Sequence, residues 1–112
     1  MENFMSVDIK VKGEVLTARL SGEIDHHNAI YMRKAIDTAC DVNMPSLVII
    51  DFGGVNFMDS SGIGLVMGRY KNLSKRGAEL HISGANPHIY KVMKLSGLER
   101  IVKLENDFEK RF

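Results

Sequence analysis

The sequence contains no tryptophan, two prolines and a single cysteine, Cys40, among its 112 residues. One cysteine cannot form a disulfide within the chain, and this usage fits a reducing cytoplasm. No apolar run approaches the roughly 18 residues that a membrane-spanning helix needs. The first residues have neither the basic start nor the apolar stretch of a secretory signal. These absences predict a cytoplasmic protein with no membrane association.

The sequence also lacks an excess of one charge sign. Fifteen Lys and Arg residues against fourteen Asp and Glu residues give a formal net charge of +1. A nucleic-acid-binding domain normally carries a basic face, so we expect no nucleic-acid partner. The hydrophobic content of 45% and the charged content of 26% are ordinary globular values. We expect residues 1–112 to form a single domain with its own core.

Segments with strand periodicity alternate along the chain with segments of helical periodicity. Val7, Ile9 and Val11 alternate with polar residues, and a turn over 12–14 leads to a second strand over 15–20, which predicts a β-hairpin. The elements expected after the hairpin are a helix capped by Asp25, a strand over 47–50, a helix from Ser60, a strand over 80–82, a helix capped by Asn86, a short strand over 101–104 and a helical turn toward Phe112. This order predicts an α/β fold with a mixed sheet of four to five strands and helices packed on it.

Two of these elements carry specific expectations about burial. The continuous apolar run over 47–50 is typical of a strand that is buried on both faces. In the helix that starts near Ser60, we expect Arg69 and Lys71 on the solvent side. The residues of that helix expected to face the core are Ile63, Val66, Met67, Tyr70 and Leu73.

The predicted topology brings three connections together at one edge of the sheet. Parallel strands end at the same edge, where open α/β sheets bind ligands. The connections are 22–27, 53–61 and 83–88, and we expect this edge to bind a partner. The residues expected around Ser60 at this edge are Asp25, His26, His27 and Asn86.

Ser60 stands directly after Asp59 at the predicted start of the second helix. A helix N-terminus has unpaired N–H groups and a partial positive charge, and it accommodates a phosphate readily. The ordinary role of Asp or Ser at such a place is to cap the helix. Ile63 occupies the position at which a capping box has Glu or Gln, which weakens the capping interpretation. Ser60 is therefore a candidate phosphorylation site, and Ser61 is the second candidate acceptor.

Glycines in the same helix point to a function beyond capping. Gly62 and Gly64 fall in the first helical turn, where each costs about 1 kcal/mol relative to alanine. Gly68 continues the spacing from Gly64, so that one stripe of the helix lacks side chains. Such a stripe suits either tight packing on the sheet or the docking of a partner.

An enzymatic interpretation fits the sequence poorly. Ser60, Asp59 and the pair His26-His27 contain the residue types of a hydrolytic triad. Residues 58–62 nevertheless read Met-Asp-Ser-Ser-Gly rather than Gly-x-Ser-x-Gly, and the lysine of a phosphate-binding P-loop is missing. Adjacent histidines point to different helix faces, and no cysteine or third histidine stands at metal-ligand spacing. We expect neither enzymatic activity, nor a cofactor, nor a metal.

Four segments, in order and without insertions, carry a family resemblance. The segments are Ser21-Gly22-Glu23-Ile24-Asp25-His26-His27, Phe57-Met58-Asp59-Ser60-Ser61-Gly62-Ile63-Gly64, Gly68-Arg69-Tyr70-Lys71 and Leu95-Ser96-Gly97-Leu98. Together they resemble the STAS-domain anti-sigma factor antagonists over nearly the whole chain. The first and third segments are most similar to the members that act in sporulation.

The resemblance implies a function and a set of partners. In that family the serine directly after the Asp, here Ser60, is phosphorylated by the anti-sigma factor, which is a serine kinase that uses ATP. The unphosphorylated antagonist binds this kinase and displaces the sigma factor, phosphorylation ends the binding, and a serine phosphatase restores it. The partner-binding residues expected on this basis are Asp25, His26, His27, Asp59, Ser61, Gly62, Ile63 and Asn86. A stress-response regulator, or a scaffold with a different kinase partner, is the alternative.

Overall fold

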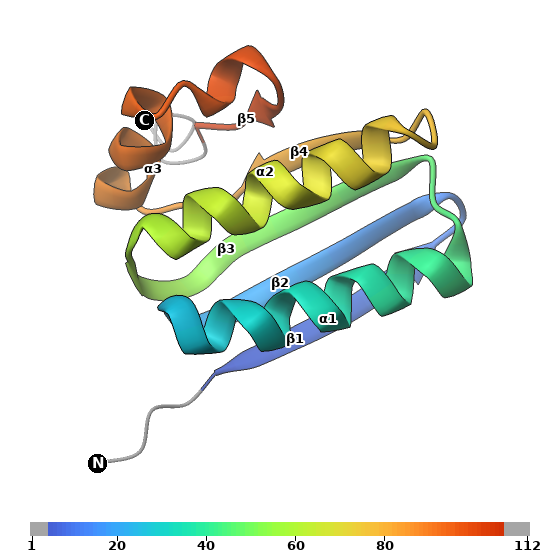
Figure 1. Ribbon diagram of the computed structural model, residues 1–112, viewed down its shortest axis with the longest axis horizontal. Coiled ribbons are helices and arrows are strands. Elements are labelled where there is room, and N and C mark those ends of the chain that lie inside the picture. The colour runs from blue at the N-terminus through green and yellow to red at the C-terminus, as the bar shows by residue number, and fades with distance from the viewer. Residues whose placement is uncertain (1–4, 107–112) are drawn as a thin grey trace.

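The computed structural model describes residues 5–106, which form one five-stranded sheet with its strands in the order β1-β2-β3-β4-β5 (Figure 1). The elements are β1 (Ser6–Lys12), β2 (Val15–Ile24), α1 (His26–Asn43), β3 (Leu47–Met58), α2 (Ser60–Ser74), β4 (Glu79–Ser83), α3 (Pro87–Leu95), the short 3-10 helix η1 (Leu98–Arg100) and β5 (Lys103–Leu104). Strands β1 and β2 pair antiparallel, and the other neighbours pair parallel. The predicted α/β fold, with a mixed sheet that opens with a hairpin, is confirmed. The helical turn expected toward Phe112 lies outside the described residues.

The core lies between the sheet and the helices α1 and α2, which run side by side across the sheet (Figure 1). Alternate residues of the central strands point toward these helices because successive side chains of a strand point to opposite faces. The fully buried residues on this face include Leu16, Ala18 and Leu20 of β2, Val48, Ile50 and Phe52 of β3, and Ile82 of β4. Met32 and Ile36 of α1 and Val66 of α2 are buried against them.

The opposite face of the sheet carries several polar and charged side chains on its first three strands. A hollow on that face is lined by Asp8, Ile9, Lys10, Thr17, Arg19 and Asp51. Arg19 Nη1 lies 3.3 Å from Asp51 Oδ2 in an exposed ion pair. Leu47 and Ile49 are only half-buried, so the expectation that the run over 47–50 is buried on both faces is wrong. The reason is that α1 and α2 pack on the same face of the sheet (Figure 1).

Strands β2 and β3 extend further than their apolar runs indicate. Their parallel pairing continues to Ile24 and Met58, across two register shifts at each of which β3 has one residue more than β2. A side chain at Gly54 would overlap the neighbouring strand at Leu20 O, and this close approach requires glycine. The connections expected over 22–27 and 53–61 are therefore reduced to one residue each, Asp25 before α1 and Asp59 before α2.

Helix α2 presents a different face to the core than its apolar pattern predicts. Val66 and Leu73 are buried as expected, whereas Met67 is 42% exposed and Ile63 and Tyr70 are half-buried. The buried residues of α2 are Gly62, Leu65, Val66, Arg69 and Leu73. The expectations that Met67 is buried and that Arg69 lies on the solvent side are wrong, while Lys71 is exposed as expected.

The buried position of Arg69 explains this difference. Arg69 is 5% exposed, and its Nε lies 2.7 Å from Asp37 Oδ1 of α1, within ion-pair distance but outside the geometry of a hydrogen bond. Its Nη1 donates to Leu65 O at 3.2 Å. Burial lowers the pKa of the Arg69 guanidinium, and the Asp37 carboxylate opposes that shift. A charged group with such a partner can occupy the buried face, and a pattern of apolar residues does not reveal it.

Two ion pairs, one between α1 and α2 and one between α1 and the turn after α2, predict unequal losses of stability. Asp37→Ala leaves the buried Arg69 without its carboxylate, and we expect it to lower the free energy of unfolding by about 1–3 kcal/mol, the cost of a buried polar group without its partner. Asp41 pairs with Arg76 on the exposed surface, so Asp41→Ala serves as the control and should have a much smaller effect. Urea denaturation of both variants measures the difference, and equal losses would contradict the assigned role of the buried pair.

The glycines of α2 also predict opposite effects on stability. A Cβ at Gly62 would overlap the Met58 side chain, whereas a Cβ at Gly64 would meet nothing within 4 Å. Gly62→Ala should destabilise the protein by about 1–3 kcal/mol through overpacking. Gly64→Ala should stabilise it by up to about 1 kcal/mol because alanine is the better helix former. Thermal unfolding tests this pair, and a shift in the same direction for both variants would contradict the packing described here.

Candidate functional site

Three helix N-termini lie at the same end of the sheet, on the left in Figure 1. Each helix follows the carboxyl end of a parallel strand and is capped by the side chain of the residue before it. Asp25 Oδ1 accepts from the Asn28 N–H at 2.7 Å, and Asn86 Oδ1 accepts from the Ile89 N–H at 2.8 Å. The predicted caps Asp25 and Asn86 are confirmed. The cap of α2 is Asp59, whose Oδ1 accepts from the Ser61 N–H at 2.7 Å.

Ser60 is the first residue of α2 and is exposed. Its position is fixed from both sides, because the Asp59 N–H donates to Ile24 O at 3.1 Å and the Gly62 N–H donates to Asp59 O at 3.1 Å. The first of these bonds also brings the connection before α2 beside the one that contains Asp25. Among residues 5–106, no side chain is recorded as a hydrogen-bond partner of the Ser60 hydroxyl. The arrangement therefore presents an accessible hydroxyl at a helix N-terminus whose backbone is anchored to the sheet.

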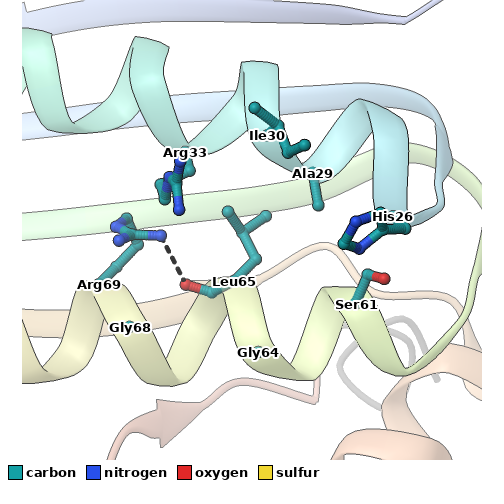
Figure 2. Close-up of a pocket in the computed structure, with 9 residues that line it drawn as sticks. All are labelled: His26, Ala29, Ile30, Arg33, Ser61, Gly64, Leu65, Gly68 and Arg69. Atoms are coloured by element: carbon teal, nitrogen blue, oxygen red, sulfur yellow. Dashed lines mark hydrogen bonds between the residues drawn. The ribbon is translucent and has the colours of Figure 1, made fainter.

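A groove with a volume of about 330 Å³ runs between α1 and α2 from this end (Figure 2). Its lining residues are His26, Ala29, Ile30, Arg33, Ser61, Gly64, Leu65, Gly68 and Arg69. His26 and Ser61 face each other at one end of the groove, and Arg33 and Arg69 lie together further along it (Figure 2). Ser61 thus connects the groove to Ser60, its neighbour in the chain.

The residues that the sequence assigns to partner binding are distributed around this end in different environments. The ring of His27 packs edge-on against Tyr31, with centroids 5.2 Å apart, and does not line the groove. Gly62 is buried against Met58, and Ile63 is half-buried against the core. The expected proximity of His27 and Asn86 to Ser60 and the partner-binding role of the whole set remain predictions.

Arg33 and Arg69 are the charged groove residues that the sequence did not assign to the site. Arg33 follows His26 by seven residues, which is two helical turns, so helical spacing along α1 was a usable signal. Arg69 follows Ser61 by eight residues, but the periodicity of apolar residues in this helix predicts that Arg69 faces solvent. Together they place positive charge in the groove, about two helical turns from the N-termini of α1 and α2.

The described part of the chain offers no cluster of three His, Cys, Asp or Glu side chains suited to a metal ion. Among the helices of residues 5–106, none combines the length and the apolar character that a membrane crossing requires.

The sequence matches a known domain family over most of its length. Residues 6–110 match the STAS domain. An anti-sigma F factor antagonist from Paenibacillus polymyxa is 32% identical over 100 residues, which are 89% of this chain and 86% of the relative. An anti-sigma-B factor antagonist from Listeria monocytogenes is 28% identical over 103 residues, which are 91% of this chain and 90% of the relative.

Solved structures of similar proteins share the fold. The anti-sigma factor antagonist SpoIIAA in its unphosphorylated form is 32% identical, with a TM-score of 0.76 over 96% of this chain and 92% of that one. The Bacillus cell fate determinant SpoIIAA in the phosphorylated form is also 32% identical, with a TM-score of 0.69 over 96% of each chain. The chain therefore belongs to the STAS-domain family and, within it, to the anti-sigma factor antagonists.

Proposed function

We propose that this protein regulates a sigma factor in the cytoplasm through reversible phosphorylation of Ser60. Unphosphorylated, it binds an anti-sigma factor that is a serine kinase, and the sigma factor is released. The kinase then phosphorylates Ser60, which ends the binding, and a serine phosphatase restores it. The observation that carries this proposal is the exposed hydroxyl of Ser60 at the N-terminus of α2. The similarity to SpoIIAA, which has been solved in phosphorylated and unphosphorylated forms, supports it.

The helix start favours Ser60 over Ser61 as the acceptor. Ser60 is exposed, whereas Ser61 is half-buried and lines the groove opposite His26 (Figure 2). The backbone N–H of Ser61 is already bound by Asp59. A kinase active site must surround the hydroxyl that it phosphorylates, and the Ser60 side chain is the more accessible of the two.

The free protein should retain its fold when Ser60 is phosphorylated. A phosphoserine carries about −1.5 to −2 charge near neutral pH. The positive end of the α2 dipole stabilises an anion at this place. Because Ser60 is exposed, the phosphate remains in water and displaces no core side chain.

The complex with the anti-sigma factor should be much weaker after phosphorylation. At an interface the phosphate loses its water and lies next to the carboxylate of Asp59, with the connection that contains Asp25 alongside. Like charges brought together in a desolvated contact oppose binding. A penalty of about 3 kcal/mol lowers an affinity roughly 100-fold. The switch therefore acts by exclusion at the interface and needs no rearrangement of the sheet.

The anti-sigma-B relatives favour a second candidate in which the partner belongs to a stress response. One of them is 28% identical to this chain over 91% of its length. The switch at Ser60 is the same in both candidates, and only the kinase differs. Binding measured against an anti-sigma F factor and an anti-sigma-B factor from the same organism distinguishes them.

Phosphorylation of Ser60 is tested directly by mass spectrometry. After incubation with ATP and the anti-sigma factor kinase, we expect the intact mass to increase by one phosphoryl group, which site mapping assigns to Ser60. Ser60→Ala should abolish the increase, and the matched variant Ser61→Ala should retain it. A phosphoryl group that persists on Ser60→Ala would refute the choice of acceptor.

The charge-exclusion mechanism is tested with two substitutions of similar size. Ser60→Asp should bind the anti-sigma factor at least about tenfold more weakly than the unmodified protein because it adds a charge at the interface. Ser60→Asn adds similar bulk without charge and should bind more tightly than Ser60→Asp. Calorimetric titration measures both affinities, and equal weakening by the two variants would mean that steric exclusion, not charge, ends the binding.

A further inference from the structure

The groove between α1 and α2 contains two glycines that the fold itself does not require. A Cβ at Gly64 or at Gly68 would meet nothing within 4 Å, and neither residue has a positive φ. Gly62, in contrast, is held against Met58. Glycine is a poor helix former, so two unneeded glycines in one helix are unfavourable for the free protein. Because Gly64 and Gly68 have no side chains, another chain can approach α2 closely on the side that faces the groove.

The groove also has more positive than negative charge. Arg33 is exposed and makes no recorded ion pair within residues 5–106. Arg69 is buried and shares the carboxylate of Asp37. Burial lowers the pKa of Arg69, and the charge of Arg33 adds to that effect, which means that the two guanidinium groups repel each other. An additional carboxylate beside Arg33 would relieve this repulsion.

The remaining lining residues indicate what kind of partner segment the groove can bind. Ala29, Ile30 and Leu65 give the groove an apolar surface between its two ends (Figure 2). Ser61 and His26 form the end that adjoins Ser60. A partner that covers Ser60 therefore also reaches the opening of the groove. This combination fits an apolar segment that carries an acidic side chain.

We propose that the groove is a second docking site for the anti-sigma factor, occupied by an apolar segment of that partner with an acidic side chain on Arg33. The segment lies along the two helices, with its backbone close to Gly64 and Gly68. This inference rests on the function proposed above and adds a contact about two helical turns away from the phosphoacceptor. The contact contributes affinity that does not depend on the charge state of Ser60.

The charge contact is tested by binding of the purified anti-sigma factor to full-length variants. Arg33→Gln should weaken binding at least about fivefold, Arg33→Glu should weaken it further, and the loss should shrink as salt is raised. Arg100 is an exposed arginine in η1, outside the groove, and Arg100→Gln is the matched control that should bind within about twofold of the unmodified protein.

The close approach is tested with Gly68→Ala. We expect this variant to unfold at a higher temperature than the unmodified protein because alanine favours the helix. It should nevertheless bind the anti-sigma factor more weakly, since the added methyl group projects into the groove. A gain in stability with unchanged affinity would overturn the docking of a chain over Gly68.

The outcomes separate this inference from the function on which it rests. If Arg33→Gln binds like the unmodified protein while Ser60 is still phosphorylated, the groove is not a docking site and the switch stands. If the unmodified protein neither binds the anti-sigma factor nor is phosphorylated, both proposals fail. If sedimentation shows a dimer that Arg33→Glu dissociates in the absence of the anti-sigma factor, the occupant is a second copy and the present assignment is overturned.

Discussion

The hydrogen bond between the Ser61 N–H and Asp59 Oδ1 defines where α2 begins, and the position of Ser60 depends on that start. Asp59 is the only residue between β3 and α2, and its own N–H is bound to Ile24 O at the end of β2. The cap residue of α2 is thus hydrogen-bonded to the last residue of β2, directly after the end of the β2–β3 pairing. Since a single residue joins the strand to the helix, the backbone at Ser60 is positioned by the sheet itself. Such a residue can be presented to a kinase without a conformational change.

The contact between α1 and α2 varies along their length. Toward the carboxyl ends, the ion pair Asp37–Arg69 joins the two helices, and the ion pair Asp41–Arg76 joins α1 to the turn that follows α2. Toward their N-termini they are separated by the groove that begins at His26 and Ser61. One end of the helix pair therefore contributes to stability, and the other leaves a surface available for recognition. The proposed partner would use the open end, where the phosphoacceptor also lies.

The order of the elements and the helix caps follow from the sequence because they depend on local chemistry. Alternation in 7–11, the turn at Gly13 and the caps Asp25 and Asn86 are short-range signals, and the structure has all of them. Which face of α2 packs against the core is not predictable from such local signals. Arg69 is buried because Asp37 on another helix neutralises its charge, and this partner is 32 residues away in the sequence.

The candidate site also has one part that local sequence signals predict and one part that depends on tertiary packing. Ser60 stands out in the sequence because hydroxyl, Asp and glycines occur together at a helix start, and the structure leaves it exposed there. The groove and its two arginines depend on how two helices pack, which no local pattern encodes. The full extent of β2 and β3 was missed for a related reason, since their pairing continues through glycines such as Gly54 that lower strand propensity but permit close approach.

The central claim is that phosphate on Ser60 ends binding while the fold is retained. The most direct measurement compares purified unphosphorylated and Ser60-phosphorylated protein for affinity toward the anti-sigma factor and for amide hydrogen exchange in the free state. We expect the affinity to fall about 100-fold or more, with unchanged protection of β2, β3 and α1. Equal affinities, or a loss of protection across the sheet on phosphorylation, would contradict the account.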